Sequence, residues 1–238
     1  MKDKKKSLKN KNLLKNTKSK KIKAIIFDIG GVLQLIKYDE TSGKSKKSKS
    51  PEKTNYTGVH SYVSKKFGLT IDQYFDSIDW IYLKSFTGEL SKDKTISLMA
   101  EHLKTTPEKI KKAYHTAYKK NFKLNKELLI KAKELKKSGY KIAILSDIWP
   151  LAKDVLVIDE FYKTFDLVVL SCDIKSRKPF QEIFKKTLSK LNIKPSEAVF
   201  IDNQTWNTKT SQKLGISSIL FKNNKQAIKE LNEFLNEK

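Results

Sequence analysis

Short apolar runs alternate with helical patterns over most of the chain after residue 124, and this alternation most restricts the possible folds. The runs lie at 141–145, 167–171, 198–201 and 216–221, with one more at 23–27. Helical patterns lie between and after them, at 125–140, 180–193, 207–215 and 224–235. Short apolar strands that alternate with helices indicate a parallel sheet covered on both faces. The pattern therefore predicts an α/β fold.

A block without any strand pattern separates the first apolar run from the others. It contains four helical patterns, at 57–68, 70–86, 90–103 and 106–122. Ser91 is a suitable N-cap for the third pattern. Thr106 is a suitable N-cap for the fourth, with Pro107 at the first helical position. The chain is therefore expected to form one α/β core that a helical insertion interrupts.

Two polar stretches carry no periodic pattern. Residues 1–21 are rich in lysine and asparagine and have little to bury, which predicts a disordered tail. The alternative for this tail is an arm that contacts nucleic acid. Residues 37–53 contain serines, a glycine and a proline without periodicity, and we expect them to form a mobile loop or insertion.

The charge of the chain is strongly positive. Lysine and arginine number 50 against 26 acidic residues, which gives a net charge of +24. Arg177 is the single arginine, whereas interfaces that read phosphates and bases usually recruit arginine. The excess therefore fits a lysine-rich composition with weak, non-specific binding of polyanions through the tail. Cys172 is the only cysteine, and no apolar run reaches the length of a membrane span or a secretory signal, so we expect a cytoplasmic protein without disulfides.

Polar side chains follow four of the predicted strands. In open parallel sheets, ligands bind beyond the carboxyl ends of the strands. The side chains at these positions are therefore expected to meet at one rim, and they are Asp28, Ser146, Asp147, Arg177, Lys178, Asp202 and Asn203.

These residue types suit phosphoryl transfer. A carboxylate such as Asp28 can attack phosphorus and hold the phosphoryl group covalently. Mg²⁺ takes oxygen ligands and can reduce the repulsion between two anions, and Asp28 and Asp202 can supply such ligands. Lys178 can neutralise the nucleophile and the phosphate, while Ser146 can donate a hydrogen bond to a phosphoryl oxygen. The glycine pair after Asp28 allows the backbone to approach a ligand closely.

Four segments of the chain resemble the four motifs of the haloacid dehalogenase-like (HAD) hydrolase superfamily. The segments "FDIGGVL", "ILSD", "RKP" and "VFIDNQTWNTKTSQKLGI" agree with those motifs in order and spacing. The resemblance covers residues 22–36 and 124–222. The helical block lies where this superfamily often inserts an α-helical cap, and "GELSKDKTISLMAEHL" at 88–103 is similar to a cap segment of its small sugar-phosphatase-like members.

The resemblance implies a Rossmann-like core with a cap. Its parts would be the tail at 1–21, the core at 22–36 plus 124–238, and a loop with the helical cap at 37–123. It also implies a Mg²⁺-dependent phosphatase that acts on a small phosphorylated metabolite. Asp28 would be the nucleophile, with Ser146 and Lys178 as catalytic partners. The metal ligands would be Asp28, the backbone carbonyl of Gly30, and Asp202. The phosphate would be bound by Gly30, Gly31, Ser146, Asp147, Lys178 and Asn203.

The chain departs from the family pattern at two positions. Phosphatases of the superfamily usually carry a second aspartate two residues after the nucleophile, where it protonates the leaving oxygen and later activates water. This chain has Gly30 there, as does a branch of the family that includes phosphatases. The fourth motif often has paired acids, and here the second is Asn203. Asn207 fits the usual asparagine of that motif.

Two other functions are compatible with this pattern. A protein that keeps the fold for binding or regulation would explain the missing acid, the reduced metal site and the basic tail. A 2-haloacid dehalogenase would need no acid for the halide, but those enzymes hold their substrate with a cap arginine and need no metal. Among other candidates, Trp149 and Trp206 lie near the expected rim, where one of them can line the pocket.

Overall fold

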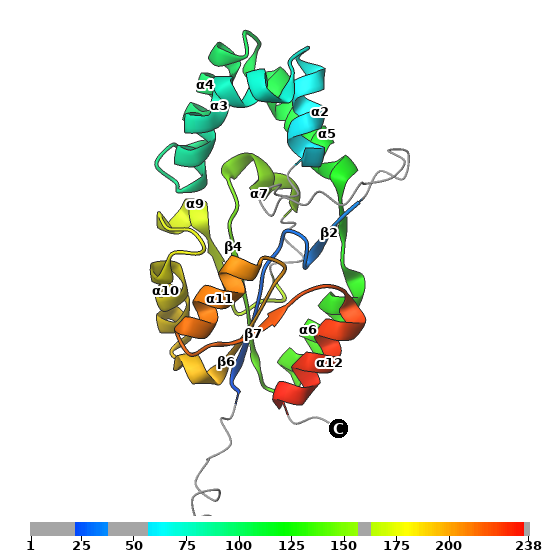
Figure 1. Ribbon diagram of the computed structural model, residues 1–238, viewed down its shortest axis with the longest axis vertical. Coiled ribbons are helices and arrows are strands. Elements are labelled where there is room, and N and C mark those ends of the chain that lie inside the picture. Colours follow the sequence, from blue (N-terminus) through cyan, green and yellow to red (C-terminus); the bar gives the residue numbers. More distant parts are fainter. Residues whose placement is uncertain (1–21, 38–56, 157–162, 236–238) are drawn as a thin grey trace, which may run out of the picture.

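A parallel sheet forms the centre of the computed structural model, which describes residues 22–37, 57–156 and 163–235 (Figure 1). Its five strands are in the order β5-β4-β1-β6-β7, and every neighbouring pair is parallel. The bounds are Ala24–Phe27 for β1, Lys141–Ser146 for β4, Leu167–Leu170 for β5, Ala198–Asp202 for β6 and Ser217–Leu220 for β7. The predicted parallel α/β sheet is confirmed.

Helices cover both faces of this sheet, as the apolar strands require. Helices α6 (Lys126–Lys137) and α12 (Asn224–Leu235) pack on one face, and α10 (Gln181–Leu191) and α11 (Thr205–Lys213) pack on the other (Figure 1). The side chains of successive β1 residues lie alternately on the two faces of the sheet. Ile25 and Phe27 belong to the larger hydrophobic cluster with α6 and α12, whereas Ala24 and Ile26 belong to the cluster with α10.

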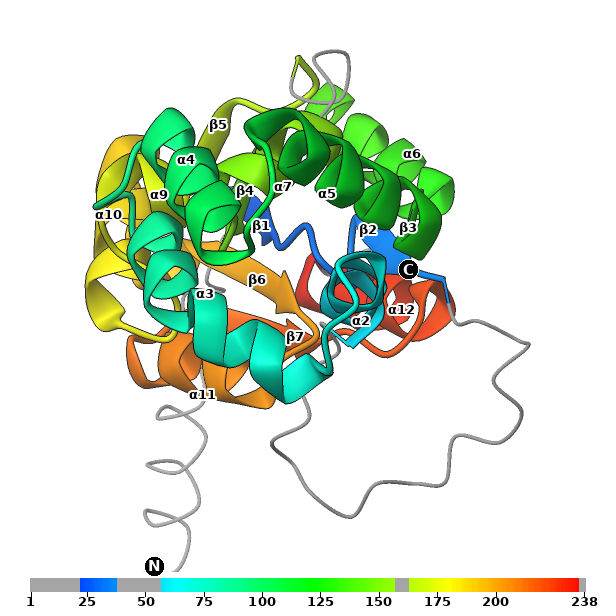
Figure 2. The ribbon, with the colours of Figure 1, turned by 90° about the horizontal axis from the view of Figure 1, so that it is seen from above.

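Four helices form a separate group beyond the carboxyl ends of the strands (Figures 1 and 2). They are α2 (Thr57–Lys66), α3 (Ile71–Phe86), α4 (Lys92–His102) and α5 (Pro107–Asn121). The side chain of Ser91 caps α4 and that of Thr106 caps α5, with Pro107 in its first turn, so both predicted caps are confirmed. Helix α3 begins with a full capping box between Thr70 and Gln73.

A buried aromatic cluster connects this helical group to the core. Trp149 lies just after β4 and is almost fully buried, and its Nε1 donates a hydrogen bond of 2.6 Å to Tyr118 Oη on α5. On the other side of the cluster, His60 Nδ1 lies 3.1 Å from Tyr74 Oη, which in turn contacts the hydroxyl of Tyr114. Burial lowers the pKa of His60 to about 4.

A short antiparallel ribbon joins the helical group to the core, and the sequence pattern did not predict it. It pairs β2 (Gln34–Ile36) with β3 (Phe122–Leu124). Three residues are too few to show a strand period, so such elements are visible only in the fold. Helices α7 (Pro150–Leu156) and α9 (Ser171–Ile174) were also missed, because one or two helical turns are too short to show a helical period. The division of the chain at 36 and 124 stays a prediction, and the ribbon lies at both positions.

The expected tail at 1–21 and nearly all of the expected loop at 37–53 lie outside the described residues. Within the described ranges, no helix has both the length and the apolar character that a membrane span needs.

Candidate active site

Asp28 is the first residue after β1, and it is almost wholly buried. Its backbone N–H continues the sheet by donating to Ile201 O at 2.9 Å. The turn that follows depends on glycine at one position. Gly31 has a φ of +84°, and a Cβ atom there would lie 2.3 Å from Asn203 Nδ2. A Cβ at Gly30 would instead meet no atom within 4 Å.

Two donors hold one oxygen of the Asp28 carboxylate. Ser146, the last residue of β4, donates from Oγ to Asp28 Oδ1 at 2.7 Å. Lys178 donates from Nζ to the same oxygen at 2.8 Å. No residue in the described ranges donates a hydrogen bond to Oδ2 of Asp28. The carboxylate is therefore fixed through one oxygen while the other remains available to a ligand.

Lys178 also binds the second carboxylate of the rim. Its Nζ lies 2.6 Å from Asp202 Oδ2. Burial alone would lower the pKa of Lys178, but the attraction of Asp202 and Asp28 outweighs burial and raises this pKa well above its usual value. Burial raises the pKa of Asp202, and the positive charge of Lys178, its hydrogen bond and that of the Gln204 N–H (2.7 Å) oppose that rise. Asn207 Nδ2 also donates to Asp202 Oδ2 at 3.0 Å. Lys178 is therefore a permanent cation between two acids.

Asp147 supports the backbone of this lysine. Its Oδ1 accepts a hydrogen bond of 2.9 Å from the Lys178 N–H. Burial raises the pKa of Asp147 to about 7, and the positive charge of Lys178 opposes this rise. The Asp147 carboxyl therefore exchanges its proton close to neutral pH.

A cavity of about 180 Å³ opens at these side chains. Of the residues expected at the rim, all but Asp202 line it, and Asp202 lies fully buried behind Lys178. Gly31 does not line the cavity but packs under Asn203. The complete lining is Asp28, Gly30, Tyr82, Leu83, Phe86, Ser146, Asp147, Arg177, Lys178, Pro179, Asn203, Gln204, Trp206 and Asn207. The fold thus brings the candidate residues together, while their chemical roles stay predictions.

The oxygen atoms of the site fit a hard divalent cation. The amide oxygens of Asn203 and Asn207 are buried and have no hydrogen-bond donor among the described residues. Buried polar atoms usually have a hydrogen-bond partner, and water bound to a cation would donate to these amide oxygens. No group of three His, Cys, Asp or Glu side chains arranged for a metal occurs in the described ranges. Mg²⁺ commonly uses only one or two carboxylates and keeps several waters. Asp28 Oδ2, which has no donor among the described residues, suits this role, whereas both oxygens of Asp202 already accept the hydrogen bonds described above.

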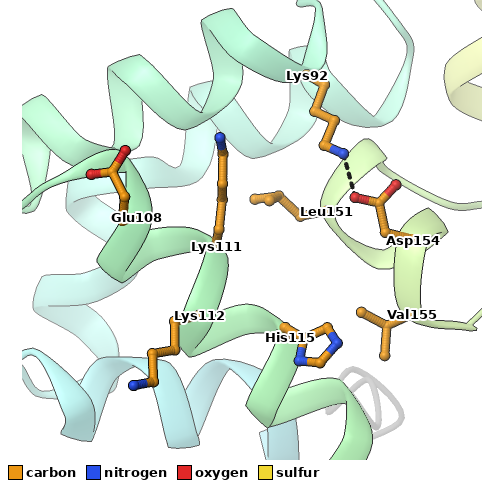
Figure 3. A pocket seen from close by; sticks show the side chains of 8 residues that line it. All are labelled: Lys92, Glu108, Lys111, Lys112, His115, Leu151, Asp154 and Val155. Atoms are coloured by element: carbon orange, nitrogen blue, oxygen red, sulfur yellow. Dashed lines mark hydrogen bonds and ion pairs between the residues drawn. The ribbon is translucent and has the colours of Figure 1, made fainter.

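A larger hollow of about 410 Å³ lies elsewhere, between α4, α5 and α7 (Figure 3). Lys92 and Asp154 form an ion pair beside it. The remaining lining consists of Glu108, Lys111, Lys112, His115, Leu151 and Val155. None of the expected rim residues lines this hollow. Since its basic side chains are spread along exposed helix surfaces, the cavity at Asp28 is the better candidate for chemistry.

Sequence reasoning missed the wall that the helical group contributes. Tyr82, Leu83 and Phe86 of α3 line the cavity, although the sequence indicated only a helical pattern at 70–86. Which turn of a helix approaches the sheet depends on tertiary packing, so no local pattern could have identified this wall. Of the two tryptophans near the expected rim, Trp206 lines the cavity and Trp149 is buried outside it.

Comparisons with known proteins agree with the fold. The family model of the haloacid dehalogenase-like hydrolases matches residues 25–221. The chain is 25% identical over 229 residues to bifunctional epoxide hydrolase 2 of Rattus norvegicus, and the match covers 88% of this chain but only 38% of the rat protein. It is 33% identical over 98 residues to the glyceraldehyde 3-phosphate phosphatase of Pyrococcus furiosus, which covers 39% of this chain and 40% of that protein.

Solved structures show the same architecture. A HAD family enzyme from Bacteroides thetaiotaomicron superposes with a TM-score of 0.69 at 22% identity, over 85% of this chain and 94% of that one. The wild-type form of the same enzyme, in complex with magnesium and inorganic phosphate, has a TM-score of 0.66 at 22% identity, over 84% and 94% of the two chains. At this identity, the likeness is one of fold.

Proposed function

Because the chain belongs to the haloacid dehalogenase-like hydrolase family, we propose that it is a Mg²⁺-dependent phosphatase acting on a small phosphomonoester. One observation carries the proposal. The Asp28 carboxylate faces a cavity with Oδ1 held by Ser146 and Lys178, while no described residue donates to its Oδ2. This arrangement suits a nucleophile whose attacking oxygen must be fixed in direction and free of competing donors.

The reaction proceeds in two steps in this proposal. Asp28 Oδ2 attacks phosphorus, the bond from phosphorus to the leaving oxygen breaks, and an aspartyl-phosphate forms. Water then attacks the same phosphorus, which releases inorganic phosphate and restores the carboxylate. Lys178 offsets the negative charge of Asp28 and of the phosphoryl oxygens throughout, and Ser146 can redirect its hydroxyl to a phosphoryl oxygen.

Mg²⁺ would be held by Asp28, Asp202 and the backbone carbonyl of Gly30, where it would reduce the repulsion between nucleophile and phosphate. The amide side chains of Asn203 and Asn207 would orient the waters around it. With Asn203 in place of a second acid, the site carries less negative charge. We therefore propose a metal site of modest affinity.

The leaving oxygen needs a proton, and Gly30 cannot supply one. Asp147 is the titratable side chain best suited to this task, because it lines the cavity and exchanges its proton near neutral pH. In this proposal, Asp147 protonates the departing alkoxide directly or through one water, and it takes a proton back from the attacking water when the bond between phosphorus and Asp28 breaks in the second step. The helical group α2 to α5 acts as the cap that covers the cavity, since α3 forms its outer wall.

The relatives support a phosphatase without deciding it. One matched relative is a glyceraldehyde 3-phosphate phosphatase, and one structural neighbour was crystallised with magnesium and phosphate. The second candidate is a catalytically weakened binding or regulatory protein, which the absence of a side chain at Gly30 favours. A dehalogenase is not favoured, because the α3 side chains that line the cavity include no arginine and Arg177, which does line it, comes from the core.

Hydrolysis of p-nitrophenyl phosphate with Mg²⁺ or with EDTA tests the proposal. We expect Asp28→Asn to lower kcat by at least about a thousandfold, because it removes the nucleophile but keeps the shape of the side chain. Asp173→Asn is the matched control, since Asp173 is exposed and pairs with Lys153 away from the cavity. Mass spectrometry of acid-quenched protein should find a phosphoryl group on the Asp28 peptide. Equal activity of wild type and Asp28→Asn would rule out the mechanism, and tight phosphate binding without turnover would favour the binding protein.

A further inference from the structure

Two unlike sets of side chains line the cavity at Asp28. One set, around Asp28, Ser146 and Lys178, is charged or polar and comes from the core. The other set comes from α3 and from the first turn of α11, and its side chains are largely apolar. They are Tyr82, Leu83, Phe86 and Trp206. The leaving group of a phosphomonoester bound at Asp28 would therefore contact apolar side chains in the rest of the cavity.

Two of these apolar side chains are unusually exposed. Leu83 is 46% exposed and Trp206 is 40% exposed. They are two of the eight large apolar side chains that lie exposed in the described ranges, and they come from different elements but line one cavity. Apolar side chains that converge on a cavity while remaining accessible to water are typical of a ligand contact.

The apolar set offers few partners to polar groups. Its hydrogen-bonding groups are the phenol of Tyr82 and the indole N–H of Trp206, and it contains no carboxylate. Gln204 and Arg177 also line the cavity. The guanidinium of Arg177 lies 5.7 Å from the centre of the Phe180 ring and makes no ion pair with a described residue. A leaving group with many hydroxyls would lose hydrogen bonds to water here, and a positively charged one would be repelled by Arg177.

The size of the cavity limits the leaving group further. Pockets for drug-sized ligands usually measure about 300–1,000 Å³, whereas this one measures about 180 Å³. After the phosphoryl group is placed, the remaining space suits a single ring or a short branched chain.

We infer that the substrate is a phosphomonoester of a compact, apolar alcohol, and that Leu83 and Trp206 select for this leaving group. The inference rests on the proposed phosphatase function and adds the class of its substrate. Sugar phosphates and phosphocholine-like esters are disfavoured by the wall, although the cap segment resembles that of sugar-phosphatase-like proteins.

Benzyl phosphate and glucose 6-phosphate are the probes, because both release a primary alcohol and so pose a similar chemical demand. We expect kcat/KM for benzyl phosphate to exceed that for glucose 6-phosphate by at least about tenfold. Trp206→Ala should lower kcat/KM for benzyl phosphate by about tenfold and leave that for glucose 6-phosphate nearly unchanged, because only the apolar ring loses its contact. Leu83→Ala should also lower kcat/KM for benzyl phosphate more than that for glucose 6-phosphate.

Trp80→Ala is the matched control. Trp80 also lies on α3 and is 42% exposed, but it packs against His102 and does not line the cavity. Trp80→Ala should leave kcat/KM unchanged for both substrates. Calorimetric binding of benzyl phosphate to Asp28→Asn and to Asp28→Asn/Trp206→Ala gives a readout that does not need turnover, and the second affinity should be about tenfold weaker.

The two possible failures are distinguishable. Suppose that hydrolysis depends on Asp28. If Trp206→Ala then lowers kcat/KM for both substrates equally, or if kcat/KM is higher for glucose 6-phosphate, the inference about the leaving group is overturned while the phosphatase function stands. If hydrolysis does not depend on Asp28, the proposed function fails. In that case, unchanged binding of benzyl phosphate in the Trp206→Ala background also overturns the inference.

Discussion

Lys178 Nζ lies 2.8 Å from Oδ1 of Asp28, and the two side chains are 2% and 8% exposed although 150 residues separate them in the chain. The same Nζ lies 2.6 Å from the fully buried Asp202. A single ammonium group therefore balances two acids in a region with little water. Isolated charges in such surroundings are costly, so this pairing contributes to stability as well as to the proposed chemistry.

Lys178→Met should destabilise the protein strongly. We expect the free energy of unfolding to fall by about 3–5 kcal/mol, because two buried carboxylates lose their cation. Urea unfolding measures the change. Lys186→Met is the control, since Lys186 forms an exposed pair with Glu182 and a long hydrogen bond to Ile174 O, so its loss should change stability much less. Adding Asp202→Asn to Lys178→Met should restore part of the loss, and equal effects of the two lysine substitutions would refute the burial argument.

Gly30→Asp should raise kcat. The family resemblance implies an acid at this position, Gly30 lines the cavity, and a Cβ there would meet nothing within 4 Å. Acid–base help of this kind is worth about 10²–10⁴-fold, most visibly with an alkyl phosphate that has a poor leaving group. Gly31→Asp is the matched contrast. With a φ of +84° and a Cβ against Asn203, it should unfold at lower urea concentration and gain no activity. A well-folded Gly30→Asp protein with unchanged kcat would argue against the expected role of this position.

The sequence predicted the regular part of the fold because its strands and helices are long enough to show a pattern. Every predicted strand of the sheet lies within two residues of its observed bounds, and the caps at Ser91 and Thr106 form as expected. The β2–β3 ribbon was missed because neighbouring strands of three residues have no local signature. Their pairing depends on contacts between residues about 90 positions apart, such as Gln34 and Leu124.

Only the part of the candidate site that the core strands supply could be predicted from the sequence. Residues after successive parallel strands must meet at one edge, so Asp28, Ser146 and Asp202 could be grouped from the strand pattern alone. The apolar wall could not, because its position depends on how α3 packs over the sheet. Burial of Asp147, which raises its pKa, likewise depends on surrounding elements and has no signal in the sequence.

The ionisation of the Asp147 carboxyl should be visible in the pH dependence of kcat. Its pKa of about 7 means that the carboxyl holds a proton below neutrality and loses it above. With benzyl phosphate, where the leaving alkoxide needs a proton, we expect kcat to fall as pH rises through about 7. Asp147→Asn should lower kcat below pH 7 and remove this step from the profile. An unchanged step in Asp147→Asn would exclude Asp147 as the acid.

The same carboxyl should also affect stability. In the unfolded chain it ionises near its ordinary pKa of 3.8, whereas the folded protein retains the proton up to about pH 7. The folded state is therefore favoured at low pH by this group, and that contribution is lost as pH rises from about 4 to about 7. Asp147→Asn removes the penalty, so it should increase the free energy of unfolding at pH 8 by up to about 4 kcal/mol. Urea unfolding at pH 3, pH 5 and pH 8 measures the difference, which should be smallest at pH 3, less than half its full size at pH 5 and largest at pH 8.

His60 should make the protein sensitive to acid from within the helical group. It is 1% exposed, contacts the Tyr74 hydroxyl at 3.1 Å, and packs against the rings of Phe75, Tyr82 and Tyr114. Burial lowers its pKa to about 4 from an ordinary value of 6.5, so the unfolded chain binds the proton first as pH falls. The stabilising contribution is present above about pH 6.5 and is lost by about pH 4, and it amounts to about 3 kcal/mol.

Substitution of His60 isolates this contribution. His60→Phe should remove the slope of stability against pH that His60 contributes between pH 4 and 6.5. The comparison is made in an Asp147→Asn background, because Asp147 contributes a slope of opposite sign over the same pH range. The absolute stability at pH 7 will also change because the contact with Tyr74 is lost. His102→Gln is the control, because His102 lies exposed on α4 against Trp80 and should leave the slope intact. Thermal unfolding at several pH values gives the slopes. If His102→Gln flattens the curve and His60→Phe does not, the acid sensitivity originates outside the buried aromatic cluster, and the assignment to His60 is wrong.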